Sequence, residues 1–292
     1  MSYIGRFAPS PTGPLHAGSL VAALASYLDA RAHQGQWLIR IEDIDETRTI
    51  AGAADDIIHT LAALGMQSDE TILWQSQRQS RYEAAFIELG NRVYPCACSR
   101  KEIADSRVSL SNDGAAIYPG TCRLGLPEGR SARAWRLRVP DAEDALDIIE
   151  FNDRWQGRVS ESLSVAVGDF VLRRADGFWA YQLAVVVDDA DQEITHVVRG
   201  ADLLESTARQ IYLQRLLHKK IPHYLHVPVL TNDRGEKLSK QTGAKALDIS
   251  QPVNTLLDAA VALELDIKTE AINSVQTFFD AAVPAWARRF GD

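Results

Sequence analysis

The chain has 292 residues, of which 46% are hydrophobic and 24% are charged, and its formal net charge is −8. This composition allows a well-buried core, more readily in two structural units than in one, and argues against a largely disordered protein. The acidic balance excludes nucleic-acid binding through overall charge, so such binding needs a local basic surface. The sequence has no apolar run of membrane-spanning length and no signal-peptide pattern, which predicts a cytoplasmic protein without a membrane partner.

The first quarter of the chain alternates between strand and helix patterns. Four elements are predicted there: a strand over 3–7, a helix over about 15–33, a strand over 36–41 and a helix over 51–64. Gly65 stands where a residue of left-handed conformation commonly ends a helix. This βαβα order is typical of an α/β fold with a parallel, doubly wound sheet.

The pattern changes within residues 93–178, where glycine, proline and arginine are frequent, and this segment is interpreted as an insertion. The α/β pattern returns from Trp179, with a helix predicted over 203–218 and a strand over 226–230. Leucines at helical spacing predict short helices beyond Ala246. Four parts are therefore expected: 1–92, the first half of an α/β domain; 93–178, the insertion; 179–245, the second half; and 246–292, a helical tail.

The loop between the first strand and the first helix has the composition of a phosphate-binding site. Three prolines stiffen it, and Gly13 and Gly18 allow a ligand to approach the backbone closely. His16 is expected near the helix N-terminus, where free N–H groups and the helix dipole favour phosphate. An ordinary turn before an amphipathic helix would explain His16 and Gly18 alone, but it explains the whole run over 6–19 poorly.

A second basic loop follows the strand predicted over 226–230. Lys237 and Lys240 flank Ser239 after the turn-forming residues 232–235. Two ammonium groups on a loop suit a triphosphate whose charge shifts as pyrophosphate leaves. Taken alone, the same residues are better explained by a solvated basic loop.

Charged residues at the end of the second strand indicate an amino-acid site. Free glutamate carries two carboxylates and one ammonium group, and Arg6 and Arg199 could each bind a carboxylate. Glu42 could bind the ammonium group, and Tyr181 could add a hydroxyl. The alternative is that Glu42 and Arg40 form only a structural ion pair beside the sheet.

The three cysteines are clustered in the insertion. Cys96 and Cys98 could place two thiolates on one metal, Cys122 a third, and Tyr118 a phenolate oxygen. Zinc accepts such ligands in tetrahedral array. The alternative is a set of reduced, free thiols, because Cys-x-Cys is less diagnostic than Cys-x₂-Cys.

Five segments together resemble the catalytic part of the class I glutamyl-tRNA synthetases, over about residues 3–245. They are 6–19, a HIGH-type signature; 40–48; 187–189; 194–202; and 235–240, a KMSKS-type signature. Their order and spacing make the match highly specific. The resemblance implies a Rossmann-type doubly wound parallel sheet with a zinc-bearing insertion.

Two departures from the usual synthetase pattern restrict the resemblance to one subgroup of the family. Ser19 replaces the second histidine of the HIGH pattern, a position where small residues are familiar in the glutamyl subgroup, and Gln241 ends the second signature. Only 51 residues follow Gln241, so we expect a short helical tail and no anticodon-binding domain. Both the tail and Gln241 are similar to the glutamyl-Q tRNA(Asp) synthetases, whose zinc site the set Cys96, Cys98, Tyr118 and Cys122 also resembles.

The resemblance implies activation of L-glutamate by ATP with Mg²⁺ and transfer of the glutamyl group to queuosine in the anticodon loop of tRNA(Asp), by a monomer. The implied residue roles are catalysis by His16, Lys237 and Lys240; glutamate binding by Arg6, Ala8, Ser10, Glu42, Tyr181 and Arg199; ATP binding by His16, Gly18, Ser19, Lys237, Ser239 and Lys240; and binding of a structural zinc ion by Cys96, Cys98, Tyr118 and Cys122.

Three other functions stay open at this point. The chain could be a truncated synthetase that charges a tRNA 3′ end, a non-catalytic regulator that binds glutamate or nucleotide, or a zinc-stabilised structural or tRNA-binding module. The intact set of Arg6, His16, Glu42, Lys237 and Lys240 argues against loss of catalysis.

Overall fold

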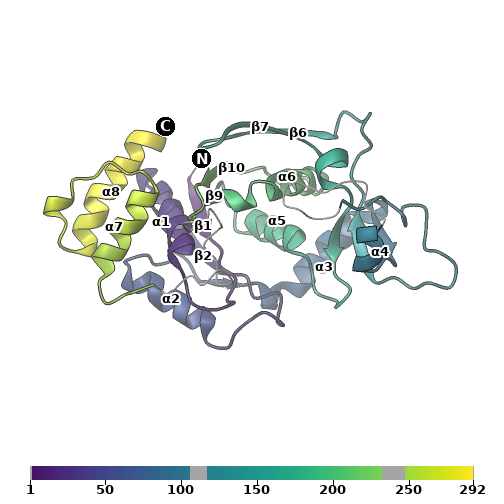
Figure 1. Ribbon diagram of the computed structural model, residues 1–292, viewed down its shortest axis with the longest axis horizontal. Coiled ribbons are helices and arrows are strands. Elements are labelled where there is room, and N and C mark those ends of the chain that lie inside the picture. Colours follow the sequence, from purple (N-terminus) through teal and green to yellow (C-terminus); the bar gives the residue numbers. More distant parts are fainter. Residues whose placement is uncertain (1, 106–116, 232–246, 292) are drawn as a thin grey trace.

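The computed structural model describes residues 2–105, 117–231 and 247–291 (Figure 1). Two groups of strands form the central sheet. The first group is parallel and consists of β1 (Ile4–Phe7), β2 (Gln36–Ile41) and β3 (Leu73–Trp74), in that order. In the second group, β9 (His196–Gly200), β10 (His223–Val227) and β6 (Ile148–Asp153) are parallel, and β7 (Gly157–Ser162) runs antiparallel to β6.

The two groups meet where β9 lies beside β1. The backbone N–H of Thr195, just before β9, donates to the carbonyl of Ile4 at 2.9 Å. The backbone N–H of Ile4 in turn donates to the Thr195 hydroxyl at 2.8 Å. From this seam the sheet continues to β2 on one side and to β10 on the other. Ligands of open α/β sheets bind at the carboxyl ends of strands at such a reversal of strand order.

Helices cover both faces of the sheet, as the doubly wound prediction requires. One face carries α1 (Ala17–Ala32) and α2 (Ala53–Ala63), and α7 (Pro252–Ala262) and α8 (Val275–Phe290) pack on the outer side of α1 (Figure 1). The other face carries α3 (Gln79–Glu88), α5 (Tyr181–Asp191) and α6 (Ser206–Leu216). Strand side chains alternate between the two cores: Trp37 and Ile39 pack with the first, and Leu38 packs with the second.

A smaller antiparallel sheet lies within the segment interpreted as an insertion. It contains β4 (Val93–Cys96), β5 (Ala134–Leu137) and β8 (Phe170–Arg173), next to the short helix α4 (Arg100–Asp105). The β6–β7 hairpin of the same segment pairs with β10, where Asp153 lies opposite Tyr224. Short 3₁₀ helices span Gln75–Arg78, Gly90–Arg92, Ala201–Leu203 and Thr269–Ala271, and a π-helical turn spans Leu163–Val167.

Most predicted elements are found within two residues of their expected ends. Gly65 has a φ of +78°, so it ends α2 in the left-handed conformation that the sequence indicated. The strand predicted over 226–230 is wrong in its position, since β10 covers His223–Val227. Pro228 cannot donate a backbone hydrogen bond, and the parallel register with β9 ends where Val227 lies opposite Gly200. No helix among the described residues is long and apolar enough to cross a membrane.

A buried carboxylate joins segments from both ends of the chain. Asp29 on α1 accepts hydrogen bonds from the Tyr3 hydroxyl at 2.5 Å and from Trp286 Nε1 at 2.8 Å. Arg154, which follows β6, binds both Asp29 oxygens, at 2.7 and 3.0 Å. One side chain therefore connects α1, β1, the end of β6 and α8.

Removal of this charge should destabilise the whole domain. For Asp29→Asn we expect the free energy of unfolding to fall by about 3–5 kcal/mol, because Arg154 loses its buried counter-ion. Urea denaturation followed by circular dichroism measures this change. The control is Glu150→Gln, which breaks the exposed pair with Arg158 and should cost at most about 1 kcal/mol. Equal losses in the two variants would contradict the role given to Asp29.

Candidate active site

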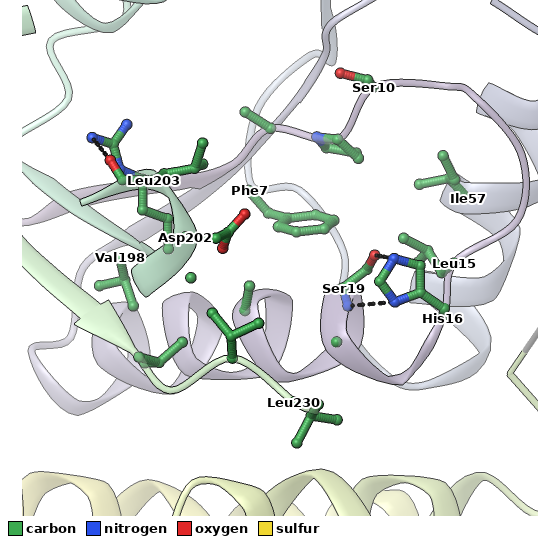
Figure 2. Close-up of a pocket in the computed structure, with 18 of the residues that line it drawn as sticks. Phe7, Ser10, Leu15, His16, Ser19, Ile57, Val198, Asp202, Leu203 and Leu230 are labelled. Carbon is green, nitrogen blue, oxygen red and sulfur yellow. Dashed lines mark hydrogen bonds between the residues drawn. The ribbon is translucent and has the colours of Figure 1, made fainter. Parts of the chain in front are cut away.

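A cavity of about 540 Å³ opens at the carboxyl ends of β1 and β9, at the seam of the sheet (Figure 2). Eight of the residues predicted from the sequence line it: Arg6, Ala8, Ser10, His16, Gly18, Ser19, Tyr181 and Arg199. Glu42 is not among the lining residues, although it is buried nearby. The fold thus brings the proline- and glycine-rich loop and the distant Arg199 to one space.

The loop that precedes α1 is held in place by backbone contacts with the segment after β2. The carbonyl of Pro9 accepts from the N–H of Glu42, and the carbonyl of Pro11 accepts from the N–H of Ile50, both at 2.9 Å. These bonds fix the loop although its prolines donate none. The loop is therefore shaped before any ligand enters.

His16 is the N-cap residue of α1, as expected from its place before the helix. Its Nδ1 accepts from the backbone N–H of Ser19 at 3.3 Å, so the ring proton lies on Nε2, which is 3.1 Å from the Ser19 hydroxyl (Figure 2). The His16 imidazole and the N-terminus of α1 consequently lie together at the wall of the cavity. This arrangement suits an anionic phosphate group.

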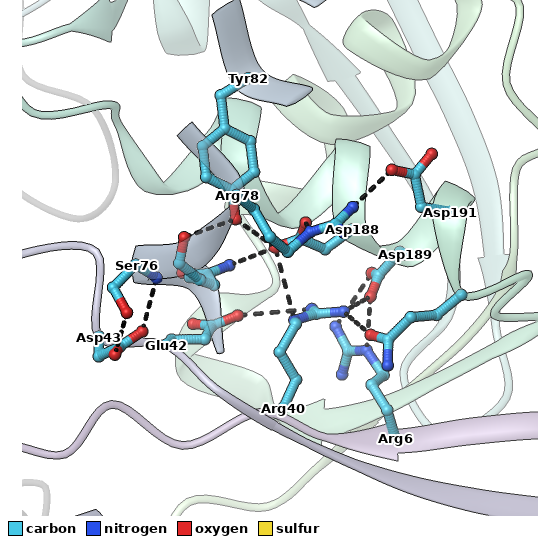
Figure 3. A network of polar contacts seen from close by, with 12 residues as sticks. Arg6, Arg40, Glu42, Asp43, Ser76, Arg78, Tyr82, Asp188, Asp189 and Asp191 are labelled. Atoms are coloured by element: carbon cyan, nitrogen blue, oxygen red, sulfur yellow. Dashed lines mark hydrogen bonds and ion pairs between the residues drawn. The ribbon is translucent and has the colours of Figure 1, made fainter. Parts of the chain in front are cut away.

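Arg6 and Arg40 share one buried carboxylate, that of Asp189 on α5 (Figure 3). Arg6 binds both Asp189 oxygens at 3.1 and 3.2 Å, and Arg40 Nη1 binds Oδ1 at 2.7 Å. Burial alone would raise the pKa of Asp189, but Arg6 and Arg40 lower it to about 2. Asp189 is therefore ionised and keeps both guanidinium groups in place.

The next residue, Asp188, anchors the far side of this network. It accepts from Gln75 Nε2 at 2.8 Å, from Arg78 Nε at 2.6 Å and from the Tyr82 hydroxyl at 2.8 Å (Figure 3). These residues lie in the segment that follows β3 and at the start of α3. Asp188 thus fixes the orientation of α5 relative to that segment.

Glu42 lies 3.4 Å from Arg40, so the ion pair that the sequence left as an alternative is present. Burial raises the pKa of Glu42 to about 7, although Arg40 and Arg6 both act to lower it. A carboxyl group in this state would gain from a further cation beside it. The ion pair with Arg40 therefore does not exclude the predicted binding of an ammonium group.

Arg199 differs from Arg6 and Arg40 in the chemistry of its contacts. Its guanidinium donates to His226 Nε2 at 3.0 Å, to the Thr207 hydroxyl at 2.9 Å and to the carbonyl of Leu203 at 3.3 Å, and it lies 3.4 Å from the Tyr181 hydroxyl. Within the described part of the chain, no carboxylate contacts Arg199. Its charge is available to a carboxylate that enters the cavity.

The cysteine cluster lies in the smaller antiparallel sheet and the loop after Tyr118. The sulfur atoms of Cys96, Cys98 and Cys122 lie within 4.8 Å of one another, and Cys98 and Cys122 are 3.7 Å apart. The Tyr118 oxygen lies 3.4 Å from the Cys96 sulfur and 3.6 Å from that of Cys98. Tetrahedral zinc with Zn–S distances of ~2.3 Å separates its sulfur ligands by ~3.8 Å, so three thiolates and one oxygen fit this geometry.

Some predicted residues lie outside the described residues, namely Lys237, Ser239, Lys240 and Gln241. Other cavity residues were not predicted as site residues. Asp202 places a carboxylate at the wall, and Ile57, Leu203 and Leu230 supply apolar surface (Figure 2). Asp202 belongs to the segment 194–202 already singled out in the sequence, and the signal that could have identified it is its place just after β9.

Comparison with known proteins places this geometry in a family. The family model described as tRNA synthetases class I (E and Q), catalytic domain, matches residues 4–257. A glutamyl-Q tRNA(Asp) synthetase of Janthinobacterium sp. (strain Marseille) is 65% identical over 288 residues, which are 99% of this chain and 98% of that protein. A protein of the same name from Verminephrobacter eiseniae is 62% identical with the same coverage.

Solved structures agree with these matches. The glutamate-tRNA synthetase of Elizabethkingia anophelis aligns with a TM-score of 0.80 and 25% identity over 96% of this chain and 66% of that one. A glutamate tRNA ligase of Elizabethkingia meningosepticum, solved in complex with its amino acid, aligns with a TM-score of 0.70 and 30% identity over 83% of this chain and 53% of that one. This chain thus spans about two thirds of the first solved protein and about half of the second, but nearly the full length of the curated relatives. The chain therefore belongs to the glutamyl-Q tRNA(Asp) synthetase family of class I tRNA synthetases.

Proposed function

We propose that this chain activates L-glutamate with ATP·Mg²⁺ and transfers the glutamyl group to queuosine in the anticodon loop of tRNA(Asp). The observation that carries the proposal is the identity of 65% along 98% of a relative named for this product. The cavity supports the same assignment, because the HIGH-type loop and Arg199 line one space.

Glutamate would be bound by complementary charges. Arg199 would bind one carboxylate and Arg6 the other, while Glu42 binds the ammonium group. The Tyr181 hydroxyl, 3.4 Å from Arg199, would add a hydrogen bond. Ala8 and Ser10 line the cavity beside Arg6 and would contact the substrate along its length.

Adenylate formation would take place at the N-terminus of α1. A carboxylate oxygen of glutamate attacks the α-phosphorus of ATP, and pyrophosphate leaves. His16, Gly18 and Ser19 would contact the phosphates, and Mg²⁺, which enters with ATP, neutralises part of their charge. Lys237, Ser239 and Lys240, outside the described residues, are proposed to bind the same triphosphate.

The second step needs no covalent enzyme intermediate. A hydroxyl of the cyclopentene diol of queuosine attacks the carbonyl carbon of the mixed anhydride, and an ester bond forms. AMP leaves with the electron pair of the broken bond, and its phosphate accepts the proton of the attacking hydroxyl. The enzyme contributes position and charge stabilisation to both steps. A structural zinc ion on Cys96, Cys98, Tyr118 and Cys122 would stabilise the small sheet, since their spacing matches its ligand geometry.

Transfer of labelled glutamate tests the proposed reaction directly. Two samples of tRNA(Asp) are compared, one with queuosine and one with unmodified guanosine at the same position, and tRNA(Glu) is the third substrate. We expect label only on the queuosine sample, and nuclease digestion should map it to the anticodon loop. Label on tRNA(Glu) alone would instead establish a truncated charging enzyme.

Glu42→Gln should have opposite effects on stability and on substrate binding: it should stabilise the fold at neutral pH and weaken the binding of glutamate. The unfolded pKa of a glutamate is near 4.5 and the folded value is about 7, so ionised Glu42 lowers stability as the pH rises through this interval. A shift of one pKa unit corresponds to ~1.4 kcal/mol. Between pH 4 and pH 8, the free energy of unfolding of the variant should therefore rise by up to about 3 kcal/mol relative to that of the native chain. Its KM for glutamate should rise, because the substrate ammonium group loses its partner.

Urea denaturation at both pH values and glutamate-dependent ATP–pyrophosphate exchange measure these two effects. The control is Glu83→Gln on the exposed face of α3, which should change neither quantity. A Glu42→Gln variant with an unchanged KM for glutamate would contradict the ammonium-binding role.

Cys98→Ser should lower the zinc content of the purified protein and its melting temperature. Loss of a direct ligand should weaken zinc binding by at least the ~10–100-fold that loss of an outer partner costs. Tyr118→Phe tests the oxygen ligand, because it keeps the ring that stacks under Arg136 at 3.9 Å. Metal analysis by mass spectrometry is the measurement, and Ser99→Ala, which removes only the hydroxyl that caps α4, is the control. Full zinc content in Cys98→Ser would remove Cys98 from the ligand set.

A further inference from the structure

Two buried residues behind Arg199 have no role in the proposed chemistry. His226 on β10 is fully buried, and Asp153 at the end of β6 is 4% exposed. His226 Nδ1 and Asp153 Oδ2 are 2.6 Å apart, and His226 Nε2 is 3.0 Å from Arg199 Nε. The three side chains thus form a row that leads from the interior of the sheet to the cavity.

The position of the proton on His226 follows from its neighbours. An arginine Nε–H can only donate, so His226 Nε2 must accept and carries no proton. The proton is therefore on Nδ1, from which it is donated to Asp153. His226 is neutral in this tautomer, in agreement with its burial, which lowers its pKa although the hydrogen bond to Asp153 acts to raise it.

Asp153 is itself held in one orientation. Its Oδ1 accepts from three backbone N–H groups: those of Gln156 at 2.8 Å, Trp155 at 3.0 Å and His226 at 3.1 Å. Oδ2 is therefore directed at His226 Nδ1. The fixed carboxylate in turn fixes the tautomer of the imidazole.

We propose that Asp153 and His226 are positioning residues for Arg199, which they hold rigidly without placing a carboxylate against it. Arg6, which lines the same cavity, differs from Arg199 in this respect. Both carboxylate oxygens of Asp189 accept hydrogen bonds from Arg6 and offset its charge at contact distance. An incoming carboxylate at Arg199 has no such competitor among the described residues. The inference rests on the proposed binding of glutamate. In it, Asp153 and His226 orient the Arg199 guanidinium, which binds one substrate carboxylate.

Asp153→Asn reverses the tautomer with little change in shape. The three backbone donors retain the amide oxygen on the Oδ1 side, so the NH₂ group faces His226 Nδ1 and donates to it. The ring proton then moves to Nε2, where it opposes the Arg199 Nε–H. We expect the KM for glutamate to rise about tenfold or more, by analogy with the loss of other supporting hydrogen bonds, and the KM for ATP to change less than about twofold.

The measurement is glutamate-dependent ATP–pyrophosphate exchange, together with ¹⁵N NMR of the labelled histidines to identify the tautomer of His226. The matched control is Tyr224→Phe, on the same strand, which removes a buried hydroxyl hydrogen-bonded to Gln214 and leaves His226 intact. It should leave both KM values unchanged. His226→Gln, which keeps a hydrogen-bond acceptor, should impair glutamate binding less than His226→Met, which offers only a weak one, and this pair serves if Asp153→Asn does not fold.

Two results would overturn the inference. One is a shifted tautomer with an unchanged KM for glutamate, and the other is an equal rise of the KM values for glutamate and ATP, which indicates general structural damage. Absence of exchange in the native protein is a different result, because it refutes the proposed function before the variants are compared.

Discussion

The active-site half of the structure depends on the burial of one carboxylate, Asp189, between two arginines of neighbouring strands. A buried charge is tolerated only when it is paired and hydrogen-bonded. Asp189 therefore requires α5 to lie across β1 and β2 in a single orientation, and Asp188 secures that orientation from the other side. The position of Tyr181, at the first turn of the same helix, follows from this constraint.

The cavity and the buried network behind it, to which Arg40 belongs, contain arginines in two electrostatic settings. Arg6 and Arg40 are compensated by carboxylates of the protein, whereas Arg199 is held by an imidazole, a hydroxyl and a carbonyl. In the first setting Asp189 holds Arg6 rigidly through Nε and Nη2 and leaves its Nη1 for a substrate carboxylate, whereas in the second no protein carboxylate among the described residues offsets the charge of Arg199. A site that binds a zwitterion with an acidic side chain needs both, because a wall of uncompensated arginines would be costly to bury.

Local patterns were sufficient to predict the alternation of strands and helices, because the apolar residues of each element recur at its own period. They also placed His16 at a helix N-terminus, since proline and glycine mark the loop before it. Asp189 had no predicted role, although 187–189 was among the segments that carried the resemblance. Its function becomes visible only when Arg6, 183 residues away, is placed beside it.

The dyad of Asp153 and His226 lies beyond sequence reasoning for the same reason. Its members are 73 residues apart and meet only because β6 and β10 are neighbours in the sheet. Asp153 was assigned to an insertion, and His226 was interpreted as an ordinary residue of a strand. The misplaced end of β10 has a local cause, the missing N–H of Pro228, which hydrophobic patterning does not detect.

The contact between Asp29 and Trp286 has a consequence for biosynthesis. The two residues are separated by 257 positions, so the first core cannot close until α8 has left the ribosome. At roughly 5–20 residues per second, the nascent chain carries both Asp29 and its partner Arg154 for about 7–30 seconds before the last helix is complete. During that interval the apolar residues of α1 that α8 covers in the folded protein lack this cover. The first core is therefore completed only after the C-terminal helix has been synthesised.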